Sequence, residues 1–202
     1  MKNVKNNSKK VFLMVALMAT VIGYANSNPF SIVKSKANRT VLTLNVKAGN
    51  LFTIKDVNGV ILFKEAIEES GVYQKGFDLT ELPNGNYFFE LDKDMEINII
   101  PFTVNANKVV YDKDNSETIF KPSTRVKDDM IFVNCLSMHK DLLEISIYYD
   151  GGSALSNYEL IHSETLTSEG NQIRKVYKIK DYTKGDYKIV YKTEGKTFVK
   201  FI

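Results

Sequence analysis

Three side chains could take part in catalysis or metal binding: His139 and His162, which are the only histidines, and Cys135, which is the only cysteine. Acid–base catalysis on a nucleophile needs a base beside that nucleophile, and zinc needs several Cys or His ligands at regular spacing. His139 lies in a polar segment that we expect to be a solvated turn, and His162 is expected to end a strand. Neither belongs to a nucleophile motif. We therefore predict no catalytic residue, no metal site, no cofactor and no enzymatic activity.

Cys135 cannot form a disulfide within the chain because it has no partner. It lies in the apolar run Met130 to Leu136, so we expect a buried thiol that acts as a small apolar side chain. The acidic cluster at Asp112, Asp114 and Glu117 has oxygen ligands of the kind that calcium prefers. It lacks the glycine and the spacing of a calcium-binding loop, so a solvated linker is the favoured interpretation.

The first 25 residues have the pattern of a secretory signal peptide. Four lysines are followed by the 12-residue apolar run Val11 to Ile22 and by Gly23-Tyr24-Ala25, with small residues at both recognition positions. A membrane anchor would need about 20 apolar residues, so we predict cleavage after Ala25 and no membrane span afterwards. The expected location is secreted or at the cell surface, with the periplasm as the alternative.

The charge of the chain changes when the predicted signal peptide is removed. The whole chain has 27 basic and 24 acidic residues, whereas 23 basic and 24 acidic residues remain after residue 25, a net charge of −1. A protein that binds a nucleic-acid backbone normally has a basic surplus. The composition therefore excludes nucleic acid as a partner.

Alternating apolar residues predict β-strands through most of the chain. Leu42, Leu44 and Val46 would share one face of a strand, as period-two patterns do. Asn58-Gly59 and Asp150-Gly151 stand between apolar strands and suit type I′ hairpin turns. Strands at intervals of 8 to 12 residues predict an all-β fold made of two tandem immunoglobulin-like, fibronectin III-like antiparallel β-sandwiches.

An internal repeat carries the prediction of two sandwiches. The segment 77–89 aligns without gaps on the segment 177–189, so that Gly85 and Tyr87 match Gly185 and Tyr187 at an offset of 100 residues. A tyrosine that opens a strand after a corner can donate its hydroxyl to upstream backbone, and a glycine permits the turn. We interpret these four residues as structural corners. The predicted domains are a signal peptide at 1–25, a first sandwich at 26–106 and a second sandwich at 107–202.

The same motif resembles a known family. The pattern of Asp56, Gly59, Gly71 and the block 77–87 resembles the Por (type IX) secretion C-terminal sorting domain, and also related immunoglobulin-like domains of exported bacterial proteins. The resemblance covers nearly the whole mature chain, once in each repeat. It implies an exported β-sandwich. Sorting domains normally follow a large cargo, and here two such modules make up the chain.

Two functions are consistent with these patterns. The first is a non-enzymatic binding or adhesion module at the cell surface or envelope, whose partner is a protein or a glycan. The second is a structural, assembly or secretion-associated component that pairs through sheet edges. Exposed aromatic residues on one sheet face would favour binding, and the candidates are Phe88, Tyr148 and Tyr158. An open edge strand with few charges would favour assembly.

Overall fold

The computed structural model describes residues 30–34, 40–139, 141–152, 157–168, 170–179 and 185–202. The predicted signal peptide lies outside these residues. The all-β prediction is confirmed, since the described chain consists of antiparallel strands with one short 3-10 helix at Leu79–Glu81. Within the described ranges, no helix has the length and apolar character needed to cross a bilayer.

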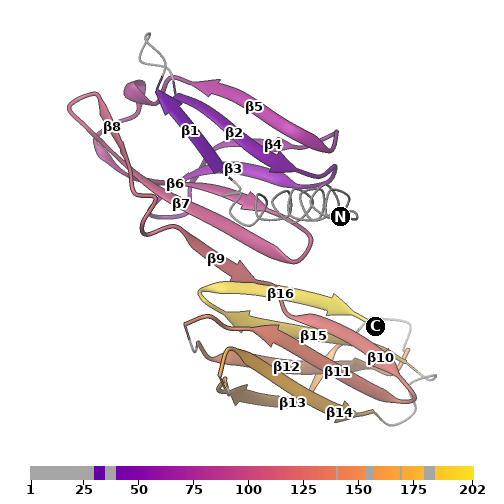
Figure 1. Ribbon diagram of the computed structural model, residues 1–202. Helices are drawn as coiled ribbons and strands as arrows, with labels where there is room; N and C mark the ends of the chain where they lie inside the picture. Colours follow the sequence, from indigo (N-terminus) through magenta and orange to yellow (C-terminus); the bar gives the residue numbers. More distant parts are fainter. Residues whose placement is uncertain (1–29, 35–39, 140, 153–156, 169, 180–184) are drawn as a thin grey trace, which may run out of the picture. The chain divides into compact units, whose positions relative to one another are not determined.

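The strands are numbered in chain order in Figure 1. They are β1 (Phe30–Lys34), β2 (Thr40–Val46), β3 (Leu51–Asp56), β4 (Ile61–Ala66), β5 (Gly71–Phe77), β6 (Gly85–Asp92), β7 (Glu96–Asn105), β8 (Lys108–Tyr111), β9 (Glu117–Phe120), β10 (Ser123–Lys127), β11 (Met130–Leu136), β12 (Leu143–Asp150), β13 (Glu159–Leu166), β14 (Gln172–Lys178), β15 (Asp186–Thr193) and β16 (Lys196–Phe201).

The chain divides into two compact units. One comprises Met1–Asn45 and Val72–Asp78, and its described strands form a sheet in the order β1-β2-β5. The predicted alternation is confirmed in β2, where Leu42, Leu44 and Val46 are buried while the residues between them are not.

The other unit comprises Val46–Gly71 and Leu79–Ile202 and contains three sheets. One has the order β4-β3-β6-β7-β8, with β9 also paired to β7; the others have the orders β10-β11-β14 and β13-β12-β15-β16. The order β1-β2-β5 thus recurs as β10-β11-β14, and β4-β3-β6-β7 recurs as β13-β12-β15-β16. In the first repeat β6 pairs with β7, and in the second β15 pairs with β16. The paired strands of the two repeats lie about 100 residues apart, which is the offset of the sequence repeat. Strand order therefore supports the internal repeat.

The sheets of residues 123–202 enclose a common core and form a β-sandwich (Figure 1). Apolar residues of β11 and β14 on one sheet, and of β12 and β15 on the other, are almost fully buried in it. Cys135 is part of this core, as predicted, and is 2% exposed. A hydrogen bond of 2.6 Å between the hydroxyls of Thr124 and Tyr191 joins the sheets. Burial raises the pKa of Tyr191 to about 12, so this hydroxyl stays protonated.

The predicted type I′ turns at Asn58-Gly59 and Asp150-Gly151 are wrong. Of the first pair only Gly59 has a positive φ, and the Asp56 N–H donates to the Val60 carbonyl across a three-residue loop. The Asp56 carboxylate accepts from two backbone N–H groups of this loop and so stabilises the wider turn. Among the described residues of the second loop only Gly152 has a positive φ, and the Asp150 carboxylate accepts from the backbone N–H groups of Gly152 and Asn157.

Two-residue turns with both residues at positive φ occur elsewhere, at Ala106-Asn107, Asp128-Asp129 and Glu194-Gly195. They connect β7 to β8, β10 to β11 and β15 to β16. The predicted domain boundary between residues 106 and 107 falls in the first of these turns. Both β8 and β9 then pair with β7, so the sheets themselves change only after Phe120. That each repeat folds independently stays a prediction.

Candidate functional site

Tyr87 makes the hydrogen bond that a tyrosine corner requires. Its hydroxyl donates to the Pro83 carbonyl at 2.7 Å, and its ring is buried against Phe102 with 5.4 Å between ring centroids. The matching Tyr187 is buried beside Tyr149 at 5.0 Å. The residues upstream of the second corner, 180–184, lie outside the described residues.

The two corner glycines differ in the space that a Cβ would have at each position. Neither Gly85 nor Gly185 is in the left-handed region, so backbone conformation is not the reason for glycine. At Gly185 a Cβ would overlap the carbonyl oxygen of Asp150, so a side chain there requires the backbone to shift. At Gly85 the nearest atom to a Cβ is the Tyr87 hydroxyl at 3.4 Å, which is close to ordinary contact.

An aromatic face lies on the outer side of the sheet β13-β12-β15-β16. The strand register places Leu160, Tyr148, Lys188 and Phe201 in one row across the four strands. These side chains point away from the sandwich core, to which the residues beside them in sequence, such as Ile147 and Ile189, belong. Tyr158, just before β13, adds a further ring. We call these five residues the aromatic face.

Contacts within the aromatic face place the lysine against the rings. The Lys188 ammonium lies 4.6 Å from the Tyr148 ring centroid and 4.7 Å from that of Tyr158. The Tyr158 ring meets Phe201 edge-on, with centroids 6.0 Å apart. Leu160 and Phe201 are 56% and 60% exposed, and the two tyrosines are half-buried. A face of rings that surrounds a cation suits a ligand that has both apolar and polar surface.

The first repeat has a different arrangement at the matching positions. Lys55 pairs with Phe88, which is half-buried, but the Lys55 ammonium donates to the Glu90 carboxylate at 2.6 Å. Lys196 of β16 donates to the other oxygen of Glu90 at the same distance. Burial raises the pKa of Glu90, but the two lysines outweigh it and hold that pKa below its usual value. This lysine is therefore neutralised by a carboxylate of its own sheet.

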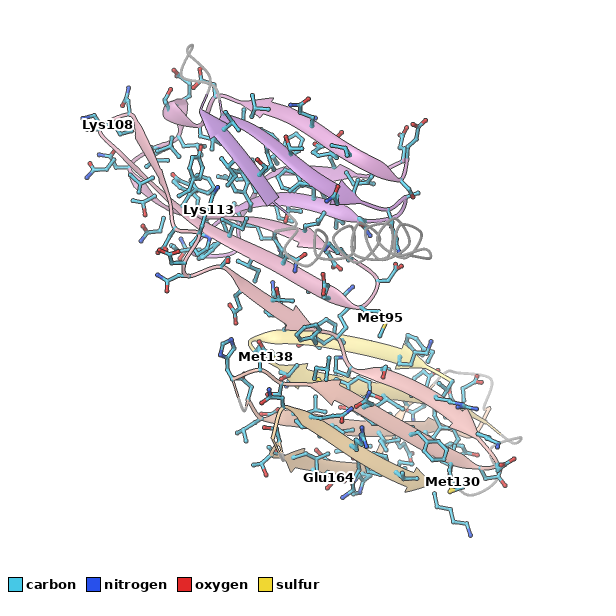
Figure 2. All side chains as sticks on the ribbon, viewed as in Figure 1. Met95, Lys108, Lys113, Met130, Met138 and Glu164 are labelled. Carbon is cyan, nitrogen blue, oxygen red and sulfur yellow. The ribbon has the colours of Figure 1, made fainter. Side chains whose placement is uncertain are left out.

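A polar cluster joins β13 to β14 near a small cavity. Glu164, labelled in Figure 2, accepts from Lys175 at 3.0 Å and lies 3.1 Å from His162 Nε2. Partial burial raises the pKa of Glu164, but the hydrogen bond from Lys175 and the neighbouring Tyr177 and His162 groups lower it to about 2. The buried Tyr177 hydroxyl faces this carboxylate without a well-formed hydrogen bond. His162 lies inside β13 rather than at the strand end that the sequence predicted.

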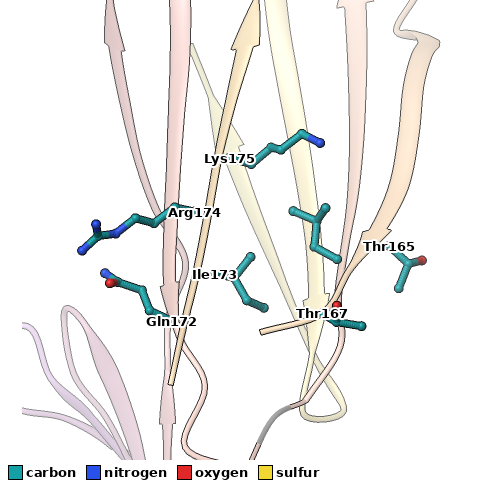
Figure 3. Close-up of a pocket in the computed structure, with 7 residues that line it drawn as sticks. Thr165, Thr167, Gln172, Ile173, Arg174 and Lys175 are labelled. Carbon is teal, nitrogen blue, oxygen red and sulfur yellow. The ribbon is translucent and has the colours of Figure 1, made fainter. Parts of the chain in front are cut away.

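The cavity has a volume of about 500 Å³. Figure 3 shows that Ile173 and Lys175 extend towards the side of Thr165, whereas Gln172 and Arg174 extend away from it. Its lining comes from the end of β13 and the start of β14: Thr165, Leu166, Thr167, Gln172, Ile173, Arg174 and Lys175. Of the polar side chains in this lining, Lys175 is engaged by Glu164 and Gln172 by Asn134.

The side chains that the sequence offers for catalysis or metal binding lie in different settings. His139 lies in an exposed turn, as predicted. Burial raises the pKa of Cys135 to about 11, so the thiol is a poor nucleophile. Burial and the nearby carboxylates of Asp141 and Glu117 raise the pKa of Glu194 to about 7. Across the described ranges, no three His, Cys, Asp or Glu side chains are grouped so as to hold a metal ion.

Sequence reasoning identified part of the aromatic face. Tyr148 and Tyr158 were candidates, while Lys188 and Phe201 were not. Lys188 lies in a strand with clear alternation, so its exposed side could be inferred, whereas the apolar residues of β16 do not alternate. The position of Lys188 and Phe201 in one row depends on the register between β15 and β16, for which the sequence has no local signal.

Comparison with known proteins adds little. No family model matches the chain, and no curated protein matches it. The resemblance to the Por sorting domain therefore stays a hypothesis. A solved structure described as "Biofilm associated protein - BSP domain" is 16% identical, with a TM-score of 0.27 over 90% of this chain and 30% of that one. The chain thus spans less than a third of that structure's length, and a likeness this weak carries no argument.

Proposed function

We propose that this protein is an exported, non-enzymatic module that binds a polysaccharide at the cell surface or envelope through the aromatic face. The observation that carries the proposal is the row of Leu160, Tyr148, Lys188 and Phe201 across one sheet. Export is supported by the signal-peptide pattern of residues 1–25 and by the resemblance to exported sorting domains.

A sugar chain fits the chemistry of this face. One side of a pyranose ring presents C–H groups, which are attracted to the negative face of an aromatic ring, and its edge presents hydroxyls. The Tyr148 and Tyr158 hydroxyls and the Lys188 ammonium lie among the rings and could bind those hydroxyls. An exposed aromatic surface also has a solvation cost, which a bound ligand would relieve.

Catalysis is not needed for this function. His162 is hydrogen-bonded to the Glu164 carboxylate, and this carboxylate also accepts from Lys175. These three residues therefore form a structural link between β13 and β14. The Cys135 thiol makes its polar contacts with the backbone carbonyl oxygens of Phe120 and Leu136. We therefore propose a binding role without turnover.

The alternative, assembly through sheet edges, is less well supported. The edge strands β4 and β13 each have a bulge, at Leu62 and at Ile161, which interrupts the regular ladder that an added strand would need. The edge strand β16 has lysines at positions 196 and 200. Bulges and edge lysines are features by which natural sheets avoid edge-to-edge pairing.

A glycan array probed with the mature protein tests the proposal. Tyr148→Ala and Phe201→Ala should each weaken binding about tenfold or more, as the loss of a central aromatic contact does. The matched control is Phe132→Ala, because Phe132 is an exposed aromatic residue of β11, on the other sheet of the same sandwich. Binding that is unchanged in both face variants, or equally reduced in the control, would refute the assignment.

A further inference from the structure

Each repeat has one lysine paired with an aromatic residue on the outer face of its larger sheet, but the two lysines differ in their partners. In the first repeat Lys55 stands opposite Phe88, and in the second Lys188 stands opposite Tyr148. Lys55 is neutralised by Glu90, two residues beyond Phe88 on the same side of β6. With the offset of 100 residues, the position that corresponds to Glu90 is Val190. In the second repeat the lysine stands on β15, at the position of Phe88, and no carboxylate stands at the position of Glu90.

Lys188 has aromatic faces as neighbours in place of a counterion. Over the parts of the chain that the structure describes, no carboxylate forms an ion pair with Lys188, whereas its ammonium lies within 4.7 Å of two ring centroids. Asp186 is exposed on the same side of β15, two residues from Lys188, and forms no ion pair with it. Glu144 is on the same side of β12 but four residues from Tyr148, roughly 13 Å along the strand. A cation–π contact near the protein surface is weak, which leaves the ammonium able to bind an anion.

We propose that the polysaccharide bound by this face is acidic, with carboxylate or sulfate groups that pair with Lys188 while its sugar rings stack on Tyr148, Tyr158 and Phe201. The inference rests on the proposed function and adds the chemical class of the ligand. A charged acceptor gives Lys188 a charge-assisted hydrogen bond, which is stronger than one to a neutral hydroxyl. The chemistry is common to uronic acids and to sulfated sugars, so the experiment must separate them.

The test is affinity electrophoresis of the mature protein in gels that contain one of three soluble polymers. Polygalacturonate supplies carboxylates, dextran sulfate supplies sulfates, and dextran is neutral. We expect at least one acidic polymer to bind about tenfold or more tightly than dextran, and this preference to decrease as salt rises from low to physiological concentration. Retention by polygalacturonate alone identifies carboxylate as the preferred anion, and retention by dextran sulfate alone identifies sulfate.

Two lysine variants make the test specific. Lys188→Gln keeps the length of the side chain but removes its charge, so it should reduce the affinity for the acidic polymer to that for dextran. Lys192→Gln is the matched control, because Lys192 is exposed on the same side of β15, four residues away and opposite Glu144. It should retain the preference for the acidic polymer.

The outcomes separate the two proposals. Equal retention by dextran and by the acidic polymers, or an unchanged preference in Lys188→Gln, overturns the inference of an acidic ligand and leaves polysaccharide binding intact. A loss of preference in Lys192→Gln equal to that in Lys188→Gln also overturns it, because the effect would then follow net charge. Retention that Tyr148→Ala leaves unchanged for every polymer overturns the proposed function itself.

Discussion

Substitution of Gly185 by alanine should destabilise the protein, while the same substitution at the repeat-equivalent Gly85 should not. An alanine Cβ at position 185 would overlap the Asp150 carbonyl oxygen and would lie 2.7 Å from the Tyr149 ring. Because the first of these atoms is backbone, relief requires a shift between β15 and β12. Forced overpacking of this kind costs about 1–3 kcal/mol.

At Gly85 the nearest neighbour of a Cβ is 3.4 Å away, and the backbone is outside the left-handed region. Alanine there adds an ordinary contact and reduces the entropy of the unfolded chain, so the free energy of unfolding should change by less than about 1 kcal/mol. Urea unfolding of both variants measures the two values, and thermal melting should show a decrease of about 2–4 °C per kcal/mol for Gly185→Ala alone. Equal midpoints for the two variants would refute the steric argument.

Three further predictions concern single contacts. Tyr87→Phe removes the donor to the carbonyl of Pro83, an exposed residue, so it should cost about 1 kcal/mol in urea unfolding, against under about 0.5 kcal/mol for Tyr148→Phe. A larger effect at Tyr148 would contradict the corner. Lys196→Ala should cost about 1 kcal/mol or less and lose its effect at high salt, because Glu90 keeps its second lysine; a salt-independent loss would show that packing matters instead. Glu194 has a pKa raised to about 7 by burial and neighbouring carboxylates, so its stabilising contribution is complete below about pH 4.5 and is lost as pH rises through 7. Glu194→Gln should flatten the decline of the unfolding midpoint between pH 5 and 8, and an unchanged pH profile would show that this carboxyl ionises freely.

The sequence predicts the strands of this fold better than it predicts their connections. The alternation in β2 and the repeat of Tyr87 and Tyr187 follow from burial and from strand geometry, which act locally. The turn at Asn58-Gly59 differs from the prediction because the Asp56 carboxylate stabilises a three-residue loop. The two-residue turn at Ala106-Asn107 was missed because it lacks the glycine that usually marks such turns.

The candidate site depends on relations that no short segment encodes. Lys188 and Phe201 join Tyr148 only through the pairing of β12 with β15 and of β15 with β16. The contrast between Lys55 and Lys188 could be found in the sequence, since Glu90 and Val190 differ at the same repeat position. That difference has meaning only once the structure shows that Lys55 reaches Glu90.

The single thiol of the second sandwich gives the protein an internal reporter of its own motions. Cys135 is enclosed between β10–β11–β14 and the sheet behind it, and burial raises its pKa to about 11, so a thiol reagent can modify it only after the sheets separate. The rate of modification by an excess of such a reagent therefore measures how often this part of the chain opens, without a label or a substitution. The same measurement with a bound polysaccharide would report, in units of opening free energy, how far a ligand on the outer face stabilises the core beneath it.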